Sequence, residues 1–214
     1  MAFIIDNFST LYNLKESIKA LKGKILDLAI QGKLVPQDEK EGVADDLLAI
    51  MKKSNGQARK KKEKDQNLHG DFEAPFEIPM SWVWTSLGDV AEINPRNQIC
   101  DDTVVSFVPM TRMNDGFGSS FSDESKRWGE VKNGFTHFAE GDIAVAKITP
   151  CFQNRKSAIM RDLRSGHGAG TTEFHIIRLK SQYMNSRFVL LFVKSDIFIK
   201  DGILNFTGTA NQKR

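Results

Sequence analysis

An uninterrupted heptad pattern of apolar residues near the start of the chain constrains the fold more than any other feature of the sequence. Successive apolar residues are three, four, three, four and three positions apart, at Leu11, Leu14, Ile18, Leu21, Ile25 and Leu28. This spacing places them on one narrow stripe of an α-helix, which we call the seam, and a narrow stripe suits packing against one other helix. Ser9 or Thr10 can cap the start of the helix, and Gly32 can occupy the position after its end.

Two partners for the seam remain open from the sequence. A second amphipathic helix is expected from about Val43 to Lys53, and it is the best partner within the chain. The alternative is the seam of another copy, which would make a homodimer through this N-terminal helix. With fewer than three heptads, neither helix is expected to be stable without a partner.

The composition changes sharply after the second helix. Residues 54–71 have almost no apolar side chains and contain a basic run from Arg59 to Lys64, as expected of a solvated linker. Pro75 and Pro79 then favour extended backbone where a new domain begins. These changes divide the chain into a helical region at residues 1–53, a basic linker at 54–71, a globular domain at 72–208 and a short terminal segment at 209–214.

The globular domain shows short apolar runs separated by turn residues, a pattern typical of β-strands. Strands are expected at Val104–Met110, Ala144–Ile148, Lys156–Met160 and Thr172–Leu179, with a strand-like stretch at residues 81–93 and helices at Ser186–Lys194 and from Asp196. Because strands and helices do not alternate regularly, the pattern predicts an α+β fold that is rich in strands and has a few short helices. The aromatic residues assigned to its core are Trp82, Trp84, Phe107, Phe138 and Phe174.

Charge and composition favour some classes of function and argue against others. The 30 basic and 27 acidic residues give a net charge of +3, but eight basic and only two acidic residues lie between Lys147 and Arg187. Such a local excess favours a polyanionic partner. No apolar run is long enough to predict a membrane span. Cys100 and Cys151 are isolated, which favours neither a disulfide framework nor a zinc site and fits a reducing cytoplasm.

Catalytic and cofactor-binding motifs are not found in the sequence. Neither of the glycine patterns that bind phosphates occurs, and the four histidines lack metal-ligand spacing. Asp123, Glu130 and Lys132 are, however, the residue types that nucleases place around Mg²⁺. Because their segment, residues 119–135, has the composition of an exposed polar loop, a Mg-dependent nuclease is kept only as an alternative.

Three segments of the globular domain combine glycines, short polar side chains and cations at expected strand ends: residues 108–116, 141–156 and 166–174. Arginine pairs with guanine edges and Asn or Gln with adenine edges, whereas Lys and Thr suit phosphates. We expect base contacts from Arg112, Asn114, Gln153 and Asn154, and phosphate contacts from Lys147, Thr149, Arg155, Lys156, Thr171 and Thr172. This hypothesis requires that the side chains converge on one positively charged surface.

Several motifs in a fixed order resemble the specificity subunit of type I restriction–modification enzymes. They are AIQGKLVPQD, IPMSWVWTSLGDVAEINPRN, FVPMTRMNDG, GDIAVAKITPCFQNRKSA, GTTEFHIIRL and GTANQKR, and they cover nearly the whole chain. The resemblance implies that residues 72–208 are a target recognition domain, which reads half of a bipartite site in double-stranded DNA. It also implies that residues 1–53 are one helical conserved region and that residues 209–214 begin a second, so that the chain is either a natural half-subunit or a truncated piece of a specificity subunit.

The same resemblance implies that the chain is not an enzyme. In that family methylation and cleavage belong to partners, namely the methyltransferase subunits that the specificity subunit docks and, indirectly, the restriction subunit. S-adenosylmethionine, ATP and Mg²⁺ are therefore expected in those partners, and no cofactor or metal is expected in this chain. A protein-binding scaffold without DNA contact is the second alternative.

Overall fold

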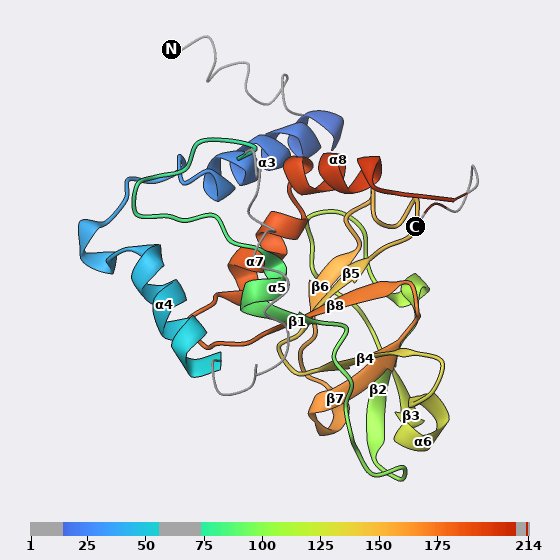
Figure 1. Ribbon diagram of the computed structural model, residues 1–214. Coiled ribbons are helices and arrows are strands. Elements are labelled where there is room, and N and C mark those ends of the chain that lie inside the picture. Colours follow the sequence, from blue (N-terminus) through green and yellow to red (C-terminus); the bar gives the residue numbers. More distant parts are fainter. Residues whose placement is uncertain (1–14, 56–73, 209–212, 214) are drawn as a thin grey trace.

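The computed structural model describes residues 15–55, 74–208 and 213. Its first part is a helical arm that contains α3 (Lys15–Ile30), the 3-10 helix η1 (Glu39–Glu41) and α4 (Ala44–Asn55). The part from residue 74 onward, which we call the domain, contains two four-stranded sheets and several helices (Figure 1). No described helix has the length and apolar character needed to cross a lipid bilayer.

The two sheets differ in the direction of their strands. In the first sheet all neighbours are antiparallel, and the strand order is β1 (Ala91–Ile93), β8 (Phe174–Leu179), β5 (Ile143–Ala146) and β6 (Ser157–Ile159). In the second sheet only β2 and β7 are parallel, and the order is β3 (Glu124–Arg127), β2 (Val104–Val108), β7 (His167–Gly170) and β4 (Thr136–Ala139). Residues 171–173 connect β7 directly to β8, so the two sheets are joined at one end.

Short helices complete the domain. Four of them have only one turn: α5 (Leu87–Val90), η2 (Met110–Arg112), α6 (Trp128–Val131) and η3 (Arg164–Gly166). The longer α7 (Ser186–Val193) and α8 (Asp196–Leu204) begin at side-chain caps, because Asn185 and Ser195 accept hydrogen bonds from backbone N–H groups of the first turn. Helix α7 packs on β5 and β6, and α3 packs on α7 and α8 (Figure 1).

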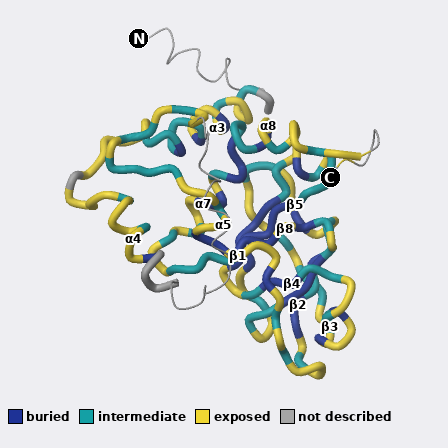
Figure 2. The backbone as a smooth tube through the Cα atoms, in the orientation of Figure 1, coloured by how far each residue is buried: buried dark blue, intermediate teal, exposed yellow. Residues whose placement is uncertain are grey.

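The first sheet is the middle layer of the domain. On its helical face, Ile143 and Val145 of β5 pack with Val189 of α7. On its other face, Ala144 of β5 packs with Phe138 of the second sheet. Strand β5 is therefore buried on both faces, and the dark blue in Figure 2 is concentrated around β5, β8 and β2.

The prediction of an α+β fold rich in strands is confirmed. The four predicted strands correspond to β2, β5, β6 and β8, and the two predicted helices to α7 and α8. Phe138 and Phe174 are fully buried as expected. Trp82, Trp84 and Phe107 are only partly buried.

The strand-like stretch predicted at residues 81–93 is confirmed only at its end, where Ala91–Ile93 form β1, and is wrong around Trp82 and Trp84. Residues 82–86 pair with no strand, and the regular structure starts at α5 and β1. The segment is held by its aromatic rings instead: Trp82 packs edge to face against Phe188 of α7, with ring centroids 5.6 Å apart. An alternating pattern predicts extended backbone, and it does not distinguish a paired strand from an extended segment that is packed through its side chains.

Residues 119–135, expected to be an exposed loop, contain β3 and α6. Trp128 is 2% exposed and belongs to a core cluster with Val105 and Val131. The Glu130 carboxylate accepts the Arg127 N–H at 2.8 Å and so caps α6. The polar residues of β3 hid this element, because β3 lies at the edge of the second sheet.

Both helices of the arm occur close to their predicted positions. Gly32 has a φ of +67°, and the Lys33 N–H donates to the Leu28 carbonyl at 2.9 Å, as expected where a helix ends in a left-handed residue. Helix α4 spans Ala44–Asn55, against a predicted Val43–Lys53. The predicted linker lies almost wholly outside the described residues.

Helix α3 buries a different stripe from the one the heptad pattern indicates. Leu26 and Ile30 are buried on the side that packs on α7 and α8, whereas Ile18 and Ile25 of the seam are 42% and 44% exposed. Helix α4 does not lie along α3 (Figure 1), so packing of the seam against the second helix is wrong for the described residues. Of the other seam residues, Leu21 and Leu28 are half-buried, and Leu11 and Leu14 lie outside the described residues.

Candidate nucleic-acid interface

Strand pairing brings the three predicted polar segments to one end of the sheets. Strands β2 and β7 are parallel with Val108 opposite Gly170, so both strands end at the same edge. Strand β5 is antiparallel to β8 with Ala146 opposite Phe174, so β5 ends there as well. The segments that leave these strands form one surface, which we call the loop surface: residues 109–116, 147–156 and 171–173.

Backbone hydrogen bonds tie the three segments to one another. The Lys147 N–H donates to the Glu173 carbonyl at 2.8 Å. The Gly116 N–H donates to the Asn154 carbonyl at 2.7 Å. Because each segment is bonded to a neighbour, the loop surface is one ordered unit and not three independent loops.

Partner side chains orient the two predicted base readers of residues 109–116. The Arg112 Nε and Nη2 groups donate to Glu124 Oε1 at 3.0 and 2.9 Å, and the arginine side chain is 41% exposed. The Asn114 Nδ2 group donates to Ser120 Oγ at 2.8 Å. Each residue therefore keeps part of its hydrogen-bonding capacity for another molecule.

The segment 147–156 supplies the most accessible polar groups of the loop surface. Gln153 and Asn154 are exposed, and Lys147 is half-buried. Within the described part of the chain, these three side chains have no hydrogen bond or ion pair to another residue. Thr149 differs, because its hydroxyl accepts the Lys213 N–H at 3.1 Å.

In the turn at residues 171–173 one threonine hydroxyl is hydrogen-bonded within the turn and the other threonine is exposed. The Thr171 hydroxyl accepts the Glu173 N–H at 3.2 Å, which closes the turn. Thr172 is exposed. Of the two predicted phosphate contacts, Thr172 is therefore the one that stays available.

His175 and Asn94, which the sequence analysis did not select, lie beside the loop surface. Asn94 Nδ2 and His175 Nδ1 are 3.3 Å apart. Desolvation of the ring and the nearby Lys147 ammonium lower the pKa of His175. The ring is consequently neutral at pH 7 and offers a hydrogen-bonding edge rather than a charge. Only the Asn-Pro turn signal marked this position in the sequence.

Two predicted phosphate contacts are instead turned into the protein. The Arg155 side chain is 11% exposed; its Nε donates to the Lys194 carbonyl at 2.8 Å and its Nη2 pairs with Asp196. The Lys156 side chain is 16% exposed; its Nζ donates to the Met110 carbonyl at 3.2 Å and lies 3.6 Å from Asp115 Oδ1. Both cations are committed to internal contacts, so we remove them from the set of expected phosphate contacts.

The residues of the nuclease alternative do not form a metal site. Asp123 pairs with Arg164 at 3.1 Å, Lys132 pairs with Asp101 at 2.7 Å, and Glu130 caps α6. Among the residues that the structure describes, no group of three His, Cys, Asp or Glu side chains is arranged to hold a metal ion.

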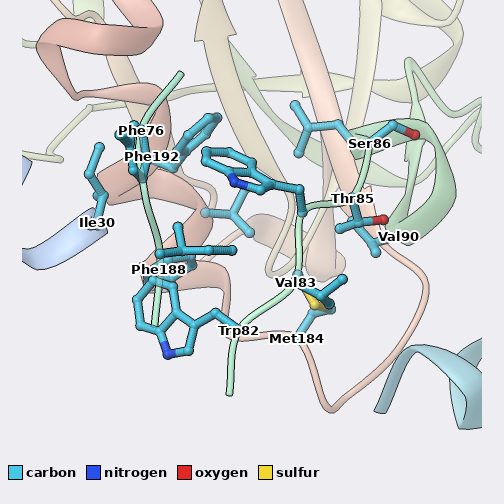
Figure 3. Close-up of a pocket in the computed structure, with 14 residues that line it drawn as sticks. Ile30, Phe76, Trp82, Val83, Thr85, Ser86, Val90, Met184, Phe188 and Phe192 are labelled. Carbon is cyan, nitrogen blue, oxygen red and sulfur yellow. The ribbon is translucent and has the colours of Figure 1, made fainter. Parts of the chain in front are cut away.

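An apolar pocket of about 130 Å³ lies where the arm meets the domain (Figure 3). Ile30 of α3, Trp82 and Phe188 of α7 line it together with other apolar side chains. The Trp82 Nε1 group donates to Gln37 Oε1 at 2.9 Å and so ties the pocket wall to the arm. These residues position the arm on the domain and present no charged group for DNA.

Two curated proteins of Escherichia coli match nearly the whole chain. The type I restriction enzyme EcoAI specificity subunit is 46% identical over 202 residues, and the type I restriction enzyme EcoEI specificity subunit is 44% identical over 202 residues. This chain is a homologue of type I restriction enzyme specificity subunits. The match covers 92% of the chain and 34% of each relative, so the chain spans about one third of the length of these specificity subunits. No protein-family model matches the chain.

Two solved structures share the fold of part of this chain. The HsdS subunit from Thermoanaerobacter tengcongensis superposes with a TM-score of 0.50 over 64% of this chain and 35% of its own, at 19% identity. A second structure, described as the structural basis of complex assembly and conformational transition of the type I R-M system, gives a TM-score of 0.51 over 65% of this chain and 36% of its own, at 18% identity. At such identity the likeness concerns the fold alone.

Proposed function

We propose that the chain is the recognition part of a type I specificity subunit and reads half of a bipartite site in double-stranded DNA without catalysing a reaction. The observation that carries this proposal is the convergence of three polar segments on the loop surface, in a chain that is homologous to specificity subunits. Loops on a rigid scaffold are where binding residues concentrate. Lys147, Gln153, Asn154 and Thr172 are the accessible members, and Arg112 and Asn114 are oriented beside them.

In this proposal partner subunits do the chemistry. Methyltransferase subunits, and through them a restriction subunit, would bring S-adenosylmethionine, ATP and Mg²⁺ to the bound DNA in the cytoplasm. The arm and its exposed apolar residues are then available for assembly. Support for these partners comes from the homology, which covers one third of each relative.

Substitutions of Asn154 and Lys147 should have different effects on DNA binding. Asn154→Ala is expected to relax one position of the recognised sequence at a cost of about 1–3 kcal/mol on the preferred duplex, because an amide reads a base edge. Lys147→Ala is expected to weaken all duplexes alike and to lower the slope of log affinity against log salt by about 1. Duplexes selected from a random pool by the chain with its methyltransferase partners, and scrambled versions of them, supply the substrates.

The matched control is Lys40→Ala, since Lys40 is an exposed lysine on the arm, away from the loop surface. Its salt slope and sequence preference should equal those of the wild type. If Asn154→Ala and Lys147→Ala affect selected and scrambled duplexes identically, the assignment to bases and phosphates is wrong. Wild-type binding that does not weaken as salt rises would favour the protein-binding scaffold.

We further propose that the exposed part of the seam packs against another chain, in the first instance a second copy. Ile18 and Ile25 are seven residues apart on α3 and are both more than 40% exposed. A two-fold dimer through this stripe would present two loop surfaces to an interrupted, palindromic DNA site. The alternative occupant of the stripe is a methyltransferase subunit.

The double substitution Ile18→Glu/Ile25→Glu is expected to convert the dimer to a monomer at micromolar concentration, because carboxylates on an apolar seam lose their hydration on pairing. Light scattering measures the mass. Since both positions are exposed, thermal unfolding of the monomer should change little. Lys40→Ala, at an exposed lysine of η1 outside α3, is the control and should leave the mass unchanged. A wild-type chain that is monomeric at that concentration contradicts the homodimer.

A further inference from the structure

A buried lysine lies beneath the loop surface. Lys194 follows α7 directly and is 1% exposed. No carboxylate of the described residues forms an ion pair with its ammonium. Burial and the Arg155 guanidinium lower the pKa of Lys194 to about 8, so that the side chain still carries its proton at pH 7. Burying a cation without an ion pair lowers the stability of the folded state, so we expect this lysine to have a specific role.

The Lys194 ammonium joins two of the polar segments from below. Its Nζ donates to the Gly116 carbonyl at 2.8 Å, the Gly118 carbonyl at 2.9 Å and the Arg155 carbonyl at 2.8 Å. An ammonium has three N–H donors, and each one here has its own acceptor. Gly116 and Gly118 follow Asn114 in the chain, and Arg155 follows Asn154, so the lysine sets the distance between two loops that carry predicted base readers.

The Arg155 side chain reinforces this arrangement. Its backbone has a φ of +57°, in the left-handed region. Its Nε donates back to the Lys194 carbonyl, and its guanidinium lies 4.9 Å from the centroid of the Phe117 ring. The tip of the loop at Phe117 is therefore held between the two cationic residues.

The same cluster contacts helix α3 of the arm. A Cβ atom at Gly23 would lie 3.5 Å from Asp196 Oδ2 and 3.8 Å from Phe117 Cζ, so the helix backbone passes close to both residues with room for no more than a small side chain. Gly23 and Ala20 line a groove with Phe117, Arg155 and Asp196. Helix α3 and the loop therefore face each other across this groove.

We infer that Lys194 is a positioning residue for sequence recognition: together with Arg155 it fixes the two reading loops relative to each other and couples them to helix α3 through Phe117. The inference rests on the proposed function, because it assigns the loops to DNA. A methionine of similar length cannot replace the lysine, since the Gly116 and Gly118 carbonyls would lose this donor and the Arg155 carbonyl would keep only the longer hydrogen bond from Ser157 Oγ, at 3.3 Å. The loops would then sample several separations while the sheets stay folded.

The test compares Lys194→Met with Lys200→Met, an exposed lysine on α8. Hydrogen exchange of the full chain is measured first and needs no DNA. Lys194→Met should accelerate exchange at least tenfold in residues 113–121 and 150–156, whereas β3 and α6 should exchange as in the wild type. Lys200→Met should leave all of these segments unchanged.

DNA binding by the assembled complex is measured second. Lys194→Met should keep its affinity for scrambled duplexes within about threefold, because the exposed phosphate contacts remain, and should lose at least tenfold of its preference for the wild-type selected duplex. Phe117→Leu removes only the contact with Arg155 and α3, and it should give a smaller loss in the same direction. If Lys194→Met does not fold, Phe117→Leu replaces it in both experiments.

Two results would overturn the inference. One is unchanged exchange of both loops in Lys194→Met and Phe117→Leu. The other is faster exchange in the loops with full preference for the selected duplex. A wild-type complex without any sequence preference would instead count against the proposed function, and the exchange data would still decide whether Lys194 and Phe117 hold the loops.

Discussion

Asp142→Ala is expected to lower the free energy of unfolding by about 3 kcal/mol, the low end of the range for a buried ion pair, because the Arg178 side chain that loses its partner is 29% exposed. Asp142 is 3% exposed, and its carboxylate accepts hydrogen bonds from Arg178 Nε and Nη2, the shortest at 2.7 Å. Arg178 Nη2 also donates to Asn97 Oδ1 at 3.0 Å, while Asn97 Nδ2 donates to the Phe138 carbonyl at 2.8 Å. The pair therefore links the first sheet to the second.

The measurement is urea-induced unfolding of the single variant and of the double variant Asp142→Leu/Arg178→Met. Replacing both charges by apolar side chains of similar size removes the uncompensated arginine, so the double variant should be more stable than Asp142→Ala. A single variant within about 1 kcal/mol of the wild type would show that water reaches Arg178 and replaces the carboxylate.

Gly168→Ala is expected to destabilise the second sheet by about 1–3 kcal/mol or more, because an added methyl group has no space. A Cβ at this position of β7 would overlap the Phe138 ring and the Ser106 carbonyl oxygen, and the latter belongs to the neighbouring strand and cannot rotate away. Gly170 is similarly enclosed, with 2.7 Å between such a Cβ and the Val108 carbonyl oxygen. The glycines allow the rings of Phe138 and Phe174 to approach the backbone of β7 closely.

Gly118→Ala is the control for this substitution. A Cβ at Gly118 meets nothing within 4 Å, so the change should stay within about 0.5 kcal/mol of the wild type. Thermal and urea unfolding of both variants give the comparison. Equal stability of Gly168→Ala and Gly118→Ala would mean that β7 shifts relative to β2 at little cost.

The sequence predicted those elements whose pattern is set by burial along the chain. Strand β5 is a continuous apolar run because both of its faces are covered, and α7 has apolar residues at helical spacing because one face covers the first sheet. Strand β3 and helix α6 were missed, because an edge strand needs few apolar residues and one turn of helix has no period. Trp128 is buried by its neighbours in space, which the local sequence does not show.

The direction of a side chain was predicted less well than its chemistry. Lys147, Arg155 and Lys156 are cations of one short segment, yet only Lys147 stays without a committed partner in the described chain. The Asp196 carboxylate and the Lys194 carbonyl bind Arg155, and the Met110 carbonyl and Asp115 bind Lys156; these contacts depend on tertiary structure. In the same way the heptad pattern predicted α3 correctly, but the side on which α7 and α8 pack determined which stripe is buried.

Site-specific photo-crosslinking to DNA tests the central claim most directly. A photoreactive amino acid is placed in turn at Arg112, Asn154 and Thr172, which represent the three segments of the loop surface, and at Gln182, an exposed residue that follows β8 at the other end of the first sheet. The chain, assembled with its methyltransferase partners, is irradiated with the duplex that it selects. We expect crosslinks from all three loop positions and none from Gln182; crosslinking at Gln182 as strong as at the loop positions would contradict the account.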